Sequence, residues 1–130
     1  MKAIIQLILL TSVILISAKC KKDDYHREII IKNNSNSKIN FSVSLDYPDT
    51  TLPCPFAIYE INTGEEYSDW VRDGWETYIF KPQYYQLFIL DPHIIDSLPC
   101  DSISKNHLII KRYQLSVDDL NSMNWIVNYP

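Results

Sequence analysis

The sequence predicts a mainly β protein, a small antiparallel β-sandwich with one or two short helices, and this prediction includes an immunoglobulin-like arrangement. About seven segments rich in β-branched and aromatic residues follow one another at short intervals, which is typical of such folds. Clusters of Pro, Asn, Asp and Gly separate these segments as turns. Helix signals are confined to short stretches near the C-terminus. A mixed α+β domain is the alternative.

The first two strands are predicted between residues 27 and 45. Residues 27–32 contain three consecutive isoleucines, and the turn-forming run 33–37 follows them. From residue 39 to residue 46, apolar and polar residues alternate at every position. This period of two places all the apolar side chains on one face of a strand. It therefore predicts a sheet with one buried face and one face in water.

The middle of the chain is predicted to contain shorter strands separated by proline and glycine. Residues 46–55 contain three prolines and are expected to form a loop. The strands that follow are expected at residues 56–61, 67–71, 77–80 and 84–90. Turn signals lie between them at residues 62–65 and 73–74. Pro82 marks a strand boundary, because proline is disfavoured inside a sheet.

Two short helices are predicted in the C-terminal part of the chain. Asp91 followed by Pro92 is typical of a helix start, and Pro99 ends that helix, with irregular structure up to residue 106. Ser116 and Asp119 have the spacing of a capping box, so a second short helix is expected after them. Strands are expected at residues 107–115 and 125–129.

The first nineteen residues predict an export signal. The apolar run from Ala3 to Ala18 is sixteen residues long, shorter than the roughly 20 residues that span a bilayer. A positive start, a short apolar run and small residues at its end are typical of a secretory signal. Two alternatives are an uncleaved apolar helix that anchors the chain, and ordinary cleavage after Ala18, which leaves Cys20 as a free thiol.

The segment Ile16–Cys20 resembles the lipobox of bacterial lipoproteins. Ala18 and Cys20 carry the match, whereas Ser17 and Lys19 depart from the family's pattern. The run KKDD after Cys20 is similar to the signal that sends Bacteroidota lipoproteins to the cell surface. The tail from Lys111 resembles small lipoproteins of unassigned function from the same group.

This resemblance implies lipid attachment, with palmitate as a typical acyl chain, through Cys20. It implies a location in the cell envelope, on the outer surface of the outer membrane. It also divides the chain into a signal peptide (1–19), a lipidated tether (20–26) and a single β-rich domain (27–130).

The cysteine count agrees with an exported protein, and the charge disfavours one class of partner. Without residues 1–19, the chain has ten Lys and Arg against sixteen Asp and Glu, a formal charge of −6. Such a charge disfavours nucleic acid as a partner, because phosphate binding rests on Lys and Arg. With Cys20 assigned to lipid, Cys54 and Cys100 remain as an even pair in predicted loops. An oxidising compartment allows them to form a disulfide, and two unpaired buried thiols are the alternative.

The sequence contains no motif that predicts an enzyme, a cofactor or a metal site. Glycine occurs only twice, so a glycine-rich phosphate loop is excluded. One compact set of residues has metal-ligand chemistry, but a helix cap and solvated side chains explain it better: Asp91, His93 and Asp96, with His107 further on. A second set lacks the spacing of a calcium loop and is explained by turns: Asp46, Asp49 and Asp73.

Aromatic residues are dense between residues 67 and 85. Exposed rings can stack on the faces of sugars, so Trp70, Trp75 and Tyr78 are candidate ligand contacts. The alternative is that these rings build the core and rim of the sandwich. Exposure of the two tryptophans around Gly74 decides between the two hypotheses, because large exposed apolar patches mark interaction sites.

The function expected from these observations is a non-catalytic binding or interaction module. Its expected partners are the membrane, through lipid on Cys20, and a protein or glycan at the cell surface. A structural or accessory subunit of an envelope complex is the alternative, which exposed edge strands or a large apolar patch would favour. A glycan-binding module and a small hydrolase are further alternatives. The hydrolase requires Asp91, His93 or His107 to converge in one pocket.

Overall fold

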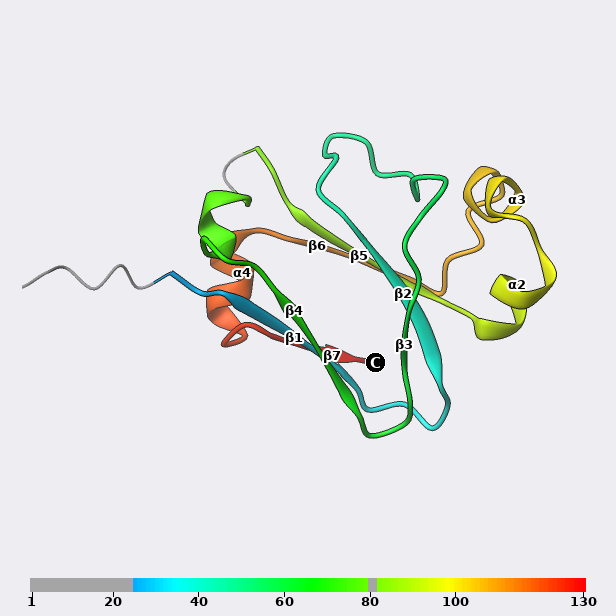
Figure 1. Cartoon of the computed structure of the whole chain (residues 1–130), viewed down its shortest axis with the longest axis horizontal. Helices are drawn as coiled ribbons and strands as arrows, with labels where there is room; N and C mark the ends of the chain where they lie inside the picture. The colour runs from blue at the N-terminus through cyan, green and yellow to red at the C-terminus, as the bar shows by residue number, and fades with distance from the viewer. Residues whose placement is uncertain (1–24, 80–81) are drawn as a thin grey trace, which may run out of the picture.

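The computed structural model describes residues 25–79 and 82–130, so the predicted signal peptide, Cys20 and the tether up to residue 24 lie outside the described residues. These residues form seven strands in two sheets, three short α-helices and one 3-10 turn (Figure 1). The predicted mainly β, sandwich-like architecture is confirmed. In this part of the chain, no helix has both the length and the apolar character needed to cross a membrane.

The smaller sheet has three strands in the order β4 (Glu66–Trp70), β1 (Glu28–Asn33) and β7 (Ile126–Tyr129). The central strand β1 runs antiparallel to β4 and parallel to β7. Its isoleucines alternate between the two faces: Ile29 and Ile31 are buried, whereas Ile30 is half-buried on the opposite face. The first and last strands of the domain are therefore joined in one sheet.

The larger sheet is antiparallel throughout, in the order β3 (Tyr59–Ile61), β2 (Ile39–Ser44), β5 (Tyr85–Leu90) and β6 (Lys111–Leu115). Apolar side chains from both sheets, from the turn after β4 and from the segment before β7 meet in one core. Each large apolar side chain that is buried contributes about 1.5–3 kcal/mol to stability. The buried members of this core are Ile29, Ile31, Ile39, Phe41, Ile61, Trp75, Ile79, Tyr85, Leu87, Ile89, Leu115, Leu120, Trp125 and Val127.

A second layer covers the outer face of the larger sheet. It consists of the proline loop after β2 and the helices α2 (Pro92–Ser97) and α3 (Cys100–Lys105). Leu52 of the loop and Ile103 of α3 pack against Phe88 and Leu90 of β5 in a separate apolar cluster. The Ser104 hydroxyl donates a hydrogen bond of 2.6 Å to the Leu52 carbonyl oxygen, so helix and loop are also bonded to each other.

The covering layer makes one prediction for β2 wrong. Strict alternation predicted that the polar residues of this strand face water, but Asn40, Ser42 and Ser44 are all buried. The reason is that the next segment of chain folds back over that face. The covering segment also contacts the neighbouring strand β5: the Gln86 side-chain amide donates a hydrogen bond of 2.8 Å to the Asp49 carbonyl oxygen.

The predicted disulfide between Cys54 and Cys100 is confirmed. The two Cα atoms lie 5.9 Å apart, although 46 positions separate the residues in sequence. Cys54 belongs to the proline loop and Cys100 is the first residue of α3. The bond therefore joins the two parts of the covering layer.

Both predicted helix starts are confirmed. The Asp91 carboxylate accepts a hydrogen bond of 2.8 Å from the backbone N–H of His93 at the start of α2. At the start of α4 (Val117–Ser122), Ser116 and Asp119 form the predicted capping box, with bonds of 3.2 and 2.8 Å. Hydrogen bonds from the Ser116 side chain and then from its backbone lower the pKa of Asp119.

Three local predictions are wrong. Residues 77–79 were predicted as strand, but a 3-10 turn, η1 (Trp75–Thr77), stands there, and the Thr77 hydroxyl bonds the Gly74 carbonyl oxygen at 2.7 Å. The strand predicted from residue 107 begins only at Lys111, because residues 107–110 form the connection from α3. The segment after α2, predicted to be irregular, contains α3, with Asp101 in its first turn and Lys105 in its last turn.

Candidate functional site

The candidate site is an open groove at the end of the molecule where the chain enters β1, far from α2 and α3 (Figure 1). The groove has a volume of about 450 Å³. Residues of β1, β4 and β7 line it together with the segments before β1 and before β7. Its rings come from three separate parts of the chain: Tyr25, His26, Trp70 and Trp125.

The floor of the groove is the outer face of the smaller sheet. Strand register places Glu28 opposite Trp70, nearest the start of β1. One step further along β1, Ile30 lies opposite Ser68 on one side and Ile126 on the other. Ile30 and Ile126 are both half-buried, so this part of the floor is apolar.

Beyond the groove, the same face becomes polar. The next row of residues places Lys32 between Glu66 and Asn128. Lys32 forms an ion pair of 3.0 Å with Glu66, and Asn128 accepts a hydrogen bond of 3.1 Å from the Asn34 side chain. The apolar part of this sheet face is thus confined to the end nearest the start of β1.

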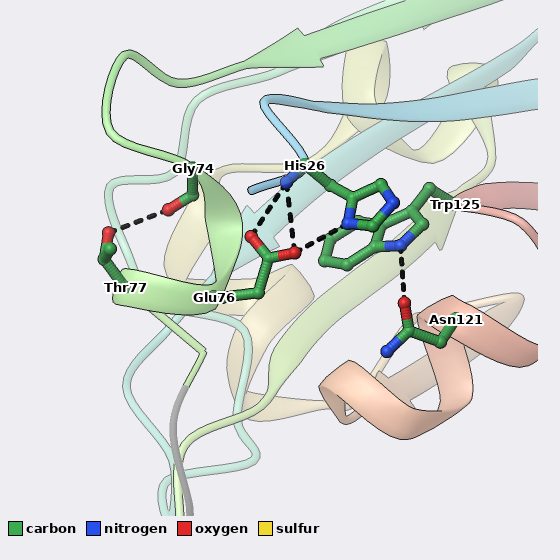
Figure 2. Close-up of polar contacts among 6 residues, drawn as sticks. All are labelled: His26, Gly74, Glu76, Thr77, Asn121 and Trp125. Atoms are coloured by element: carbon green, nitrogen blue, oxygen red, sulfur yellow. Dashed lines mark hydrogen bonds and ion pairs between the residues drawn. The ribbon is translucent and has the colours of Figure 1, made fainter. Parts of the chain in front are cut away.

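A contact set that we call the N-terminal clamp joins the groove to the turn after β4: His26, Glu76 and Trp125. His26 and Trp125 line the groove, and Glu76 binds His26 from the turn. Figure 2 shows the His26 ring lying flat on the Trp125 ring, with ring centroids 4.3 Å apart and planes tilted by 11°. The His26 Nδ1 atom lies 2.6 Å from Glu76 Oε1. The backbone N–H of His26 donates to both carboxylate oxygens at 3.0 Å.

Backbone contacts hold the same segment against the turn after β4. The Trp75 N–H donates to the His26 carbonyl oxygen at 2.7 Å, and the Val71 N–H donates to the Arg27 carbonyl oxygen at 2.9 Å. Gly74 has φ +86°, and a Cβ atom there would lie 2.5 Å from the Cβ of Tyr25. Only glycine permits this approach. The chain is therefore fixed at its entry into the domain.

The opposite side of the clamp is a strained connection between α4 and β7. Asn124 and Trp125 have φ values of 54° and 60°, in the left-handed region that non-glycine residues rarely adopt. The Trp125 indole donates a hydrogen bond of 2.9 Å to the Asn121 side-chain oxygen (Figure 2). Its backbone N–H donates to the Leu120 carbonyl oxygen at 2.8 Å. These bonds offset strain of about 1–3 kcal/mol per residue.

The structure separates the three aromatic residues that the sequence proposed as ligand contacts. Trp70 is 59 % exposed in the groove and Tyr78 is 40 % exposed, whereas Trp75 is only 4 % exposed. Trp75 packs edge-on against Tyr85, with centroids 5.2 Å apart, and its indole donates to the Asp69 carbonyl oxygen at 3.1 Å. Trp75 is therefore part of the core and has no ring face for a surface ligand.

The sequence did not identify the clamp residues. Glu76 lies 50 positions from His26, and Trp125 lies in the last six residues of the chain. No local pattern links positions so far apart. The available signal was Asp73-Gly74 between two tryptophans, which correctly marked a tight turn but not the segment that packs on it.

A polar pair of buried Tyr85 and half-buried Asp69 lies below the turn. The Tyr85 hydroxyl donates a hydrogen bond of 2.7 Å to the Asp69 carboxylate. Burial raises the pKa of Asp69, and the bond from Tyr85 lowers it by a smaller amount. Burial, followed by the nearby Asp69 charge, raises the pKa of Tyr85 well above its usual range. Both effects follow from placing charge in a poorly solvated position.

We expect Asp69→Asn to stabilise the protein at pH 7, by at most about 1 kcal/mol, because the carboxylate is only partly shielded from solvent. The folded protein binds a proton at Asp69 more tightly than the unfolded chain does. Its charged form therefore costs stability above the folded-state pKa, and that cost fades as the pH falls towards 3.8. Urea unfolding between pH 3 and 7 measures the effect, with the gain shrinking at low pH. Tyr85→Phe is the matched control and should destabilise by about 1–2 kcal/mol; a stability loss in Asp69→Asn at pH 7 would contradict the assignment.

The acidic and histidine residues near α2 line a second, separate hollow. It has a volume of about 320 Å³ and brings together Asp91, His93 and Asp96 with Lys38 and Tyr129. The Asp91 carboxylate is the cap of α2, and Lys38 forms an ion pair of 2.9 Å with Glu60. His107 does not line this hollow. Across residues 25–79 and 82–130, no three His, Cys, Asp or Glu side chains are placed to hold a metal ion.

Two of the three aspartates considered as calcium ligands, Asp46 and Asp49, accept hydrogen bonds from residues two positions away. The Asp49 carboxylate accepts hydrogen bonds from the Thr51 hydroxyl at 2.7 Å and the Thr51 backbone at 2.9 Å, and these bonds lower the pKa of Asp49. The Asp46 carboxylate accepts from the Ser44 hydroxyl at 3.1 Å. Asp73 lies in the exposed turn before Gly74.

A third hollow of about 130 Å³ is apolar and lies beside the disulfide, lined by Phe56, Ile95 and Leu98.

No protein-family model, curated protein or solved structure matches this chain.

Proposed function

We propose that this protein is a lipid-anchored, non-catalytic interaction module of an outer membrane surface, attached through Cys20. The observation that carries this proposal is the N-terminal clamp. It fixes the chain at His26, only six positions after the candidate lipid cysteine. A domain whose attached end is held by packing, hydrogen bonds and a close glycine contact is suited to a role as an anchored module.

The non-catalytic part of the proposal is supported by the tasks that the acidic groups already perform. Glu76 holds the backbone and ring of His26. Asp91 and Asp119 cap helices, and Asp69 accepts a bond from a buried tyrosine. A general acid or base needs a proton-transfer partner within reach in a substrate-sized site. In the groove, the carboxylate of Glu28 accepts from the Ser68 hydroxyl.

The interaction part of the proposal is supported by surface that remains open at the attached end. The groove exposes Trp70 and Tyr25 beside Arg27, so large rings and a cation share one concave surface. Exposed apolar surface gathered in a groove is a common feature of interaction sites.

The anchor is tested by metabolic labelling with radioactive palmitate in a bacterium that exports the protein. We expect label on the wild-type protein and none on Cys20→Ala, because the thioether and amide that carry acyl chains both form at that residue. Cys54→Ser, Cys100→Ser is the matched control and should keep the label, because its cysteines lie in the folded domain. A wild-type protein that is exported and takes up no palmitate would refute the lipid anchor.

A further inference from the structure

We infer that the groove is a membrane-docking surface, in which Trp70 and Tyr25 lie among the headgroups of the bilayer that holds the lipid anchor. This inference rests on the anchoring proposed above. It adds a second membrane contact and a defined orientation: the groove end of the domain faces the lipid, and α2 and α3 face away.

The first argument is the length of chain between anchor and domain. Five residue steps separate Cys20 from Tyr25, and five extended residues span at most about 18 Å. Because the clamp fixes His26, no further chain can be released from the domain to lengthen this connection without breaking its contacts. The groove, which begins at Tyr25, must then stay close to the membrane surface.

The second argument is the chemistry of the groove end. Among the described residues, seven large apolar or aromatic side chains are exposed. Tyr25 and Trp70 lie in the groove, and Tyr78 lies two residues after Glu76 of the clamp. All three are tryptophan or tyrosine, the residues that favour the boundary between headgroups and acyl chains. Their rings are apolar, and each has one polar atom for the wet side of that boundary.

The third argument is charge. Arg27 lines the groove, and Arg72 follows Trp70 closely in the exposed turn after β4, where Asp73 is its acidic neighbour. The protein without its signal has a formal charge of −6, so two of its few cations stand at the end that the anchor holds near lipid. Basic residues near an anionic bilayer are attracted to its surface. The one carboxylate on the groove floor, Glu28, accepts from the Ser68 hydroxyl.

The fourth argument is the gradient along the outer sheet face. The row nearest the tether contains Trp70, the next is apolar with Ile30 and Ile126, and the row beyond has the Lys32–Glu66 ion pair. An apolar area that ends within a short distance of the tethered end matches a surface that contacts the bilayer only at that end.

The test uses the acylated protein without its signal peptide, residues 20–130, reconstituted into vesicles of phosphatidylcholine and phosphatidylglycerol. Trp75 and Trp125 are buried, so Trp70 is the exposed fluorophore of the chain's three tryptophans. Phosphatidylcholine brominated on its acyl chains should quench most of the Trp70 emission and shift it to shorter wavelength. Trp70→Phe should abolish the quenched component without reducing the amount of protein that sediments with the vesicles.

A second test reverses the charge of the two arginines at the groove end and uses a distant arginine as the matched control. Arg27→Glu together with Arg72→Glu should reduce the quenching several-fold, whereas Arg112→Glu should not, because Arg112 lies on β6 and bonds the Thr50 carbonyl oxygen of the covering layer at 3.0 Å. Protein that sediments with vesicles but shows unquenched Trp70 would overturn the docking and leave the anchor standing. Protein that fails to sediment would overturn both. A Trp70 emission change produced by free oligosaccharides, and not by lipid, would assign the groove to a glycan and overturn the docking.

Discussion

Replacing Cys54 and Cys100 with serine is expected to lower the free energy of unfolding by about 4 kcal/mol. The bond closes a loop of 46 residues, and the loss of chain entropy in the unfolded state scales with the logarithm of that length. Small domains have a total stability of about 5–15 kcal/mol, so this change removes a large fraction of it. Urea unfolding followed by circular dichroism measures the difference.

The same result should be obtained in the wild-type protein with reductant. Dithiothreitol should shift the wild-type unfolding midpoint towards that of the double serine variant and leave the variant unchanged. Cys20→Ser is the matched control, because it removes a thiol outside the described domain and should not move the midpoint. A double variant within about 0.5 kcal/mol of wild type, the range of a neutral surface change, would show that the covering layer does not depend on the disulfide.

Local sequence signals predicted the elements whose cause is local. The caps at Asp91 and Ser116 each satisfy backbone groups within three residues, and both were predicted correctly. The pairing of Cys54 with Cys100 was predicted by elimination and compartment. The run of isoleucines in β1 marked a strand, but not that this strand would be the centre of a sheet paired with the last strand of the chain.

The errors arose where distant segments decide the environment. The alternating pattern of β2 predicted a solvent-exposed face, but the proline loop and α3 cover it. The residues of the strand itself carry no signal for this covering layer. The predicted strand at residues 77–79 has strand-forming residues, yet Gly74 and the packing of Trp75 impose a 3-10 turn. Tertiary packing overrode local propensity in both cases.

The candidate site was predicted only in part for the same reason. The sequence identified Trp70 as a candidate contact, and the structure places it, exposed, in the groove. It did not identify His26, Glu76 and Trp125, because their contact exists only after β1, the turn after β4 and the start of β7 have come together. A site assembled from three distant segments leaves no spacing in the sequence to recognise.

Trp75→Ala is expected to destabilise the protein by about 3–5 kcal/mol, the usual cost of deleting a buried large aromatic side chain. Trp75 is in the core against Tyr85, and its indole bonds the Asp69 carbonyl oxygen, which would lose this donor. Trp70→Ala is the matched control. It removes the same side chain five residues away from an exposed position, so its cost should stay within about 0.5 kcal/mol.

Thermal and urea unfolding of the two variants distinguishes the structural role expected for Trp75 from the binding role proposed for Trp70. The backbone N–H of Trp75 donates to the His26 carbonyl oxygen, and alanine at this position keeps that N–H. Loss of the indole should therefore destabilise the core without directly breaking this contact to the clamp. Equal costs for both variants would mean that the Trp70 ring is packed as tightly as the Trp75 ring. In that case Trp70 would have no free face for lipid, and its fluorescence could not report docking. A large difference, with Trp70→Ala close to wild type, leaves the Trp70 ring available and makes any loss of membrane contact in that variant a loss of binding, not of fold.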